Sequence, residues 1–96
     1  MDMELVLAKL RGLKPHAAAS YKAKELSVFG SFARGEQSDD SDVDVLVEFE
    51  EGADLFDLMG LALYLEGELQ RKVDVVSKRA LREELRESVL REVVAV

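Results

Sequence analysis

The middle of the chain carries only one sign of charge. Between Arg34 and Arg71 lie 36 residues with twelve carboxylates and neither Lys nor Arg, whereas both flanking segments hold more cations than anions. Carboxylates at this density repel one another, so the segment needs compensation from the basic ends of the chain, from solvent or from bound metal cations. The same charge repels duplex DNA, and we therefore expect no direct duplex DNA binding.

Length and residue types narrow the possible chemistry. A chain of 96 residues supports one hydrophobic core, so we expect one domain over residues 1–96. It contains no Cys and one His, which argues against disulfides, zinc sites and a serine-protease triad and leaves carboxylate, hydroxyl and backbone groups. No apolar run reaches the roughly 18 residues of a membrane span, and the N-terminus lacks the basic start of a signal peptide. We therefore expect a cytoplasmic protein without a membrane partner.

Hydrophobic periodicity predicts the order α-α-β-β-α-β-α. A first helix follows Asp2 and is interrupted by Gly12 and Pro15, and a second short helix runs from Pro15 through Tyr21. The remaining predicted elements are a strand at 26–29, a helical turn at 31–34, a strand at 43–49, a helix from the cap Asp54 to about 70, a strand at 73–76, and one helix, or two broken near Glu87, over 78–94. This order predicts an α/β (α+β) fold, a small mixed sheet of three to four strands with helices packed on it.

Acidic side chains alternate with valines at the start of the second strand. Asp42 and Asp44 are two residues apart, so in a strand they project from one face about 7 Å apart. Mg²⁺ typically takes one or two protein carboxylates and fills its other positions with water and substrate phosphate. If the strand containing Asp74 pairs beside this one, three carboxylates converge.

Gly30 and Ser31 lie where a strand meets a helical turn. A missing Cβ lets backbone approach a phosphate, the free N–H groups point toward it, and the Ser hydroxyl adds a donor. Together with the carboxylates, this combination indicates phosphoryl or nucleotidyl transfer assisted by two metal ions.

At this point the sequence resembles a known family. A hydrophobic strand, Gly-Ser, about ten residues and then Asp-hydrophobic-Asp are typical of the polymerase-β nucleotidyltransferase superfamily. The strings FGSFARG at 29–35 and SDVDVLV at 41–47 are similar to its minimal nucleotidyltransferase (MNT) branch. The resemblance covers nearly the whole chain, because MNT proteins are about this long and place a third Asp on the strand after the long helix, where Asp74 lies.

The resemblance implies the polymerase-β-type fold and Mg²⁺-dependent transfer of AMP from ATP to a hydroxyl, with release of pyrophosphate. Two Mg²⁺ ions are expected, for which Mn²⁺ can substitute. By the same resemblance Asp42 and Asp44 bind metal, and Asp74 completes the second metal site and helps to deprotonate the acceptor. The nucleotide-binding residues would be Gly30, Ser31 and Arg34.

The resemblance also implies a partner. MNT proteins are commonly antitoxins of HEPN ribonuclease toxins, and some adenylylate a toxin tyrosine with ATP. A HEPN-type toxin is therefore the expected protein partner, and homo-oligomer formation is left open.

The apolar positions of the helix from Asp54 extend to Phe56 and Leu63, beyond one stripe, which favours a protein interface on this helix or on the C-terminal helix.

Other interpretations of the same residues stay open at this stage. Asp42 and Asp44 could be solvated charges on an edge strand, and Asp74 could simply face solvent. Arg34 could be a structural ion-pair partner, and Ser31 could be only a helix cap. An EF-hand loop starting at Asp40 is disfavoured, since Val45 stands where such a loop needs Gly.

Two other classes of function compete with the enzyme. A non-catalytic antitoxin or regulatory protein could neutralise its partner by occlusion, with the acidic segment as the contact surface. Binding of single-stranded nucleic acid is disfavoured by the few aromatic residues and the central acidic segment.

Overall fold

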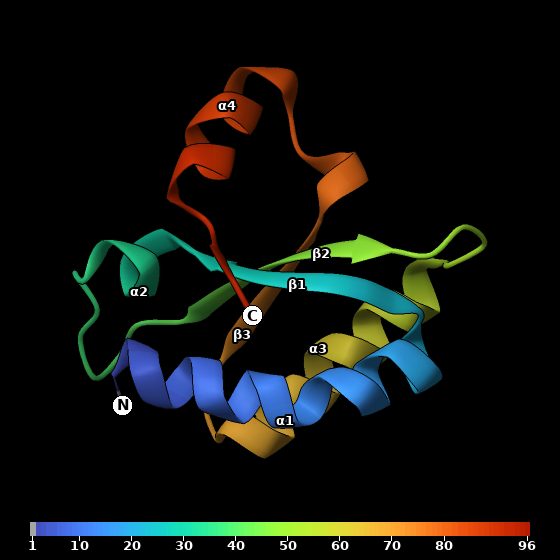
Figure 1. Ribbon diagram of the computed structural model, residues 1–96, viewed down its shortest axis with the longest axis horizontal. Helices are drawn as coiled ribbons and strands as arrows, with labels where there is room; N and C mark the ends of the chain where they lie inside the picture. Colours follow the sequence, from blue (N-terminus) through green and yellow to red (C-terminus); the bar gives the residue numbers. More distant parts are fainter. Residues whose placement is uncertain (1) are drawn as a thin grey trace.

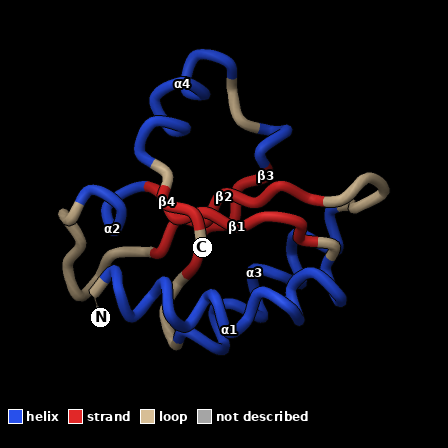
Figure 2. Tube along the Cα trace, in the orientation of Figure 1, coloured by secondary structure: helices blue, strands red, loops and turns tan. Residues whose placement is uncertain are grey.

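A computed structural model describes residues 2–96 and shows a four-stranded mixed sheet (Figures 1 and 2). The strands are β1 (Ala23–Phe29), β2 (Val43–Phe49), β3 (Val73–Ser77) and β4 (Val94–Ala95), in the spatial order β3-β2-β1-β4. β1 is antiparallel to β2 and β4, and β2 is parallel to β3. The predicted class, a small mixed sheet with packed helices, is confirmed.

The two faces of the sheet have different surroundings. Figure 1 shows α1 (Met3–Tyr21) and α3 (Leu55–Leu69) on one side and α4 (Glu83–Glu92) on the other. The hydrophobic core fills the space between the sheet and α1 and α3; its fully buried members include Val6, Leu10, Leu26, Val28, Val43, Val45, Val47, Leu61, Leu65 and Leu69. Since side chains alternate along a strand, the polar residues of β2 point to the α4 side.

The N-terminal helix differs from the prediction. α1 is one continuous helix with Pro15 inside it, not two helices separated at Gly12 and Pro15. Proline cannot donate to the carbonyl four residues earlier, that of Arg11. Both residues are exposed, so water can satisfy this carbonyl, while Leu10 and Ala17 continue the buried stripe across the site. Packing on the core side therefore outweighs the local break signal.

The helix from Asp54 begins where the sequence predicts. The Asp54 carboxylate accepts from the Asp57 N–H at 3.1 Å and Asp57 accepts from the Asp54 N–H at 3.0 Å, forming a reciprocal capping box. On this helix Leu61, Leu65 and Leu69 are buried, whereas Leu55 and Met59 are mostly exposed. The helix thus has one apolar face on the core and further apolar side chains, including Phe56 and Leu63, on its outer surface.

The C-terminal prediction is wrong in its break point and its end. Lys78–Ala80 form a 3₁₀ turn (η1), the chain is extended at Leu81 and Arg82, and α4 starts at Glu83 rather than continuing to a break near Glu87. Acidic residues at 83 and 84 favour a helix start there, because a helix N-terminus carries partial positive charge. The chain then adds β4, which pairs with Ser27 and Val28 and is too short to show a periodicity.

Across residues 2–96, no helix is both long and apolar enough to span a bilayer.

Candidate active site

Two carboxylates lie in register on neighbouring strands. Asp44 of β2 pairs with Asp74 of β3, and the flanking pairs Val43 with Val73 and Val45 with Val75 point into the core. Asp44 and Asp74 therefore project from the opposite face, on strands about 4.8 Å apart. Asp42 lies one residue before β2, two residues from Asp44. The structure thus brings the three predicted acidic residues to the end of the sheet where β2 and β3 begin, which we call the acidic edge.

This arrangement answers two of the other interpretations. β2 lies between β1 and β3, so Asp44 is not on an edge strand. Val45 is fully buried inside β2, which excludes a calcium loop at this position. Asp74 is on the edge strand β3 and is exposed.

Gly30 lies directly against Asp44. Phe29, the last residue of β1, pairs with Asp44, and Gly30 then starts the short helix α2 (Gly30–Arg34) with φ +74. A Cβ at Gly30 would lie 2.0 Å from Oδ2 of Asp44, which is a steric overlap. Glycine is therefore required here both by the backbone conformation and by the neighbouring carboxylate.

The environment raises the pKa of Asp44. Partial burial is the main cause, and the negative charges of Asp74 and Asp42 add to it, while the cation Arg34 acts in the opposite direction. Neighbouring carboxylates repel each other, and partial burial weakens the screening of this repulsion by water. A bound cation would relieve this repulsion.

Arg34 is held by two glutamates. Its Nε donates to Oε1 of Glu36 at 2.8 Å, and its Nη1 lies 3.3 Å from each carboxylate oxygen of Glu92 on α4. These contacts raise the pKa of Arg34 further. The Gly30 N–H donates to Oε1 of the same Glu92 at 3.0 Å. The Ser31 hydroxyl has no hydrogen-bond partner within the described chain, and its backbone carbonyl accepts from the Glu36 N–H at 2.9 Å.

Arg71 is a supporting residue that sequence reasoning missed. Its Nη1 donates to the carbonyls of Asp39 and Ser41 at 3.0 and 2.9 Å, and its guanidinium lies 5.5 Å from the Phe32 ring centroid. Arg71 thereby joins α2 to the loop that enters β2 at Asp42. Its one signal in the sequence is its position directly after the stretch without cations, which Arg34 precedes.

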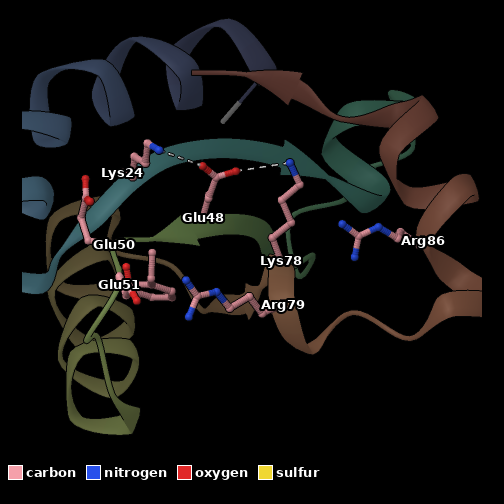
Figure 3. Close-up of a pocket in the computed structure, with 8 residues that line it drawn as sticks. Lys24, Glu48, Glu50, Glu51, Lys78, Arg79 and Arg86 are labelled. Atoms are coloured by element: carbon pink, nitrogen blue, oxygen red, sulfur yellow. Dashed lines mark hydrogen bonds and ion pairs between the residues drawn. The ribbon is translucent and has the colours of Figure 1, made fainter.

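A depression lined by charges of both signs lies further along the same strand. A cavity of about 540 Å³ lies around Glu48, four residues after Asp44, and its charged lining consists of four cations and three glutamates: Lys24, Lys78, Arg79, Arg86, Glu48, Glu50 and Glu51. Figure 3 shows Lys24 and Lys78 on either side of Glu48, whose carboxylate oxygens lie 3.6 and 3.4 Å from the two ammonium groups. None of the predicted site residues lines this cavity, so it is separate from the edge where the aspartates lie.

The acidic edge suits a hard cation that also binds substrate. Within residues 2–96, no three acidic or histidine side chains are gathered into a ready metal cage. Mg²⁺ does not require one, because it is commonly held by one or two carboxylates with water and phosphate oxygens completing its shell. Asp42 and Asp44, with Asp74 beside them, offer this donor set.

The family assignment rests on nearly the entire chain. A nucleotidyltransferase domain matches residues 6–96. The chain belongs to this nucleotidyltransferase family. The chain is 41% identical over 96 residues to protein adenylyltransferase MntA of Thermococcus cleftensis, covering 100% of this chain and 97% of that relative. The expected enzyme class, nucleotidyltransferase, is confirmed.

Solved structures of nucleotidyltransferases share the architecture. A protein assigned as a minimal nucleotidyltransferase superimposes with a TM-score of 0.87 at 47% identity, over 100% of this chain and 97% of that chain. A chain from the complex of a tri-AMPylated Shewanella oneidensis HEPN toxin with its MNT antitoxin gives a TM-score of 0.71 at 22% identity, over 97% of this chain and 70% of that chain. At 22% identity, the similarity to this antitoxin chain shows a shared fold only. The polymerase-β-type fold predicted from the sequence is thus confirmed.

Proposed function

We propose that this nucleotidyltransferase transfers AMP from ATP to a hydroxyl group of a partner protein, and that residues 1–96 act as one catalytic domain. The observation that carries the proposal is the edge where Asp44, in register with Asp74, touches Gly30. The carboxylates that would bind a cation and the Gly30 backbone that would bind phosphate are therefore adjacent. The relative named a protein adenylyltransferase supports both the nucleotide and the class of acceptor.

In this proposal the phosphates bind at the α2 turn. The Gly30 N–H, the Ser31 hydroxyl and the Arg34 guanidinium would hold the triphosphate, because Gly30 and Arg34 lie beside Asp44 and Ser31 directly follows Gly30 in α2. Asp42 and Asp44, with Asp74 at the second position, would hold divalent cations. Mg²⁺, or Mn²⁺ in its place, supplies charge neutralisation on the triphosphate when bound.

The chemical step is one substitution at the α-phosphorus. The acceptor hydroxyl oxygen forms a bond to that phosphorus, the bond to the bridging oxygen of pyrophosphate breaks, and pyrophosphate leaves with the electron pair. The hydroxyl proton passes to a base. Asp74 is the proposed base, because it is exposed at the edge of the sheet, where an acceptor can approach.

The proposed acceptor is a tyrosine of a HEPN-type toxin, which makes the chain an antitoxin. The neighbour of similar fold comes from a complex of an AMPylated HEPN toxin with an MNT antitoxin. A docking surface is available on α3, where four apolar side chains are 51 to 82% exposed: Leu55, Phe56, Met59 and Leu63. Isolated domains rarely leave such a continuous apolar strip uncovered. Self-association through the strip is the alternative, and sedimentation of the purified chain distinguishes the two.

Mass spectrometry of the partner tests the proposal. Incubation of the chain with its cognate toxin, ATP and Mg²⁺ should yield a toxin heavier by one or more AMP units, with the label on tyrosine. The chain alone should consume ATP slowly, because positioning of the acceptor can account for about 7–11 kcal/mol of such a barrier. A tight complex with a toxin of unchanged mass would overturn catalysis and favour neutralisation by occlusion. The exposed strip on α3 is the observation that favours this second function.

Metal and nucleotide binding are tested by thermal unfolding. Millimolar Mg²⁺ should raise the melting temperature, because a ligand bound only to the folded state stabilises it by mass action and the ion relieves repulsion at Asp44. Addition of ATP should increase the shift. In Asp44→Asn the Mg²⁺ effect should shrink markedly. Melting curves that do not respond to Mg²⁺ and ATP would contradict the proposed site.

A further inference from the structure

The C-terminal segment, residues 83–96, covers the site face of the sheet but is attached weakly. No residue of α4 is buried, and a cavity of about 220 Å³ lies between the sheet and the helix, lined in part by Leu46, Leu90 and Val93. β4 contributes two residues, and the Val96 N–H donates to the Leu26 carbonyl at 3.0 Å. Figure 1 shows α4 standing away from the sheet on the side opposite α1 and α3.

One residue of this segment reaches the site. Glu92, the last residue of α4, accepts from the Gly30 N–H at 3.0 Å, and both of its carboxylate oxygens lie 3.3 Å from Nη1 of Arg34. Its side chain is 25% exposed, so most of its surface is removed from water by these contacts. An anionic group therefore already occupies two donors of the α2 turn, the Gly30 N–H and the Arg34 guanidinium.

Both donors are among the three assigned above to the triphosphate. Carboxylate and phosphate oxygens bind an N–H and a guanidinium with the same geometry, and Arg in particular pairs with both. The Gly30 N–H points at one Glu92 oxygen and cannot give a full-strength hydrogen bond to a second acceptor. Two anions in the same place would also repel each other.

We infer that Glu92 is a built-in competitor of the nucleotide, so that the segment 83–96 regulates access to the site by occupying the phosphate position until it is displaced. The inference rests on the proposed function, because it assumes that Gly30 and Arg34 hold the triphosphate. The attachments of α4 and β4 are few, and Val96 is partly buried against the core while α4 has no buried residue, so displacement requires the release of this small contact and not the unfolding of the core. Nucleotide binding then includes the free energy of releasing this segment, which lowers the apparent affinity.

Nucleotide affinity of the full chain tests the competition. The dissociation constant of MgATP is measured by calorimetry for the wild type, Glu92→Gln, Glu92→Ala and the matched control Glu87→Gln. Glu87 is on the same helix, pairs with Arg91 and does not contact the α2 turn. We expect both Glu92 variants to bind MgATP at least about fivefold more tightly, since the competing charge is gone, and the control to match the wild type.

Hydrogen exchange gives an independent readout. Saturating MgATP should speed exchange of the wild-type amides in the segment 83–96, including that of Val96, while it slows exchange in α2. In Glu92→Ala the segment should exchange rapidly with or without nucleotide.

The outcomes separate this inference from the proposed function. If the wild type binds MgATP and the Glu92 variants bind it equally or more weakly, Glu92 is a structural or ligand-supporting residue and the competition is wrong. The same conclusion follows if MgATP protects the segment 83–96. If no protein, including the wild type, binds MgATP at millimolar concentration, the proposed function fails together with the inference.

Discussion

Asp44→Asn should lower the rate of AMP transfer about a thousandfold and at the same time raise the melting temperature of the protein. The rate falls because the amide keeps the volume of the side chain but loses the charge that holds the cation. Cation stabilisation of the transition state amounts to several kcal/mol, and each 1.36 kcal/mol is a factor of about ten in rate. A loss of about 4 kcal/mol gives the expected factor.

The gain in stability follows from the raised pKa of Asp44. Burial and the neighbouring charges of Asp74 and Asp42 disfavour its charged form in the folded state relative to the unfolded chain. Its ionisation therefore destabilises the fold at neutral pH, and stability increases as the pH falls through the raised pKa. The variant removes this penalty at pH 7. Its advantage should disappear near and below the ordinary value of 3.8, where the wild-type carboxyl is protonated in both states.

The measurement pairs transfer kinetics with thermal unfolding in the absence of metal. For a chain of this size, each kcal/mol of added stability raises the melting temperature by about 4–8 °C. Asp39→Asn is the matched control, because Asp39 is an exposed loop residue whose side chain has no hydrogen-bond partner in the described chain. It should change neither quantity. Near wild-type transfer by Asp44→Asn would remove Asp44 from the site, and a lower melting temperature would mean that its charge supports the fold.

Gly30→Ala should disable the site by a steric route. The added Cβ would lie 2.0 Å from Oδ2 of Asp44, so either the carboxylate or the α2 turn must move. A shift of about 1 Å in a catalytic group can reduce the rate about a hundredfold. The alanine must also adopt φ +74, which is unfavourable by about 1–2 kcal/mol for a residue with a Cβ.

Gly35→Ala separates the two effects. Gly35 has nearly the same φ, +73, but a Cβ there meets no atom within 4 Å. Both variants should lose comparable stability from the backbone conformation, whereas only Gly30→Ala should lose transfer activity as well. Transfer rates and melting temperatures of the two proteins are compared side by side. Equal rates would show that the contact between Gly30 and Asp44 is not needed for catalysis.

The sequence predicted correctly those elements that depend on a few neighbouring residues. The alternation around Val43, Val45 and Val47 predicted β2, and the Asp54 cap fixed the start of α3, because both depend on a few neighbouring residues. The same locality misled the interpretation of α1, where Pro15 is a strong break signal on its own. Only the tertiary contacts of Leu10 and Ala17 with the sheet and α3 show that the helix continues.

The site was partly predictable for the same reason. Spacing alone indicated that Asp42 and Asp44 act together, and the Gly30-Ser31 pair marked the turn. The pairing of Asp44 with Asp74 depends on β2 and β3 being parallel neighbours, which is set by the α3 crossover and not by either strand. Glu92 and Arg71 act across 62 and 30 positions of the chain through side chains that have no distinctive local pattern. Contacts of this kind become visible only in the folded molecule.

The division of the sheet into a packed face and an open face affects how this enzyme can evolve. The core lies between the sheet and helices α1 and α3, whereas the proposed site residues Asp44 and Asp74 project from the opposite face of the sheet. Exchanges on the open face leave the packing untouched, and distant sites usually contribute independently to stability. Substitutions on the open face, near Glu48 or along α4, can therefore accumulate while the scaffold stays the same. Related sequences should therefore vary on the open face and keep the buried valines of β2.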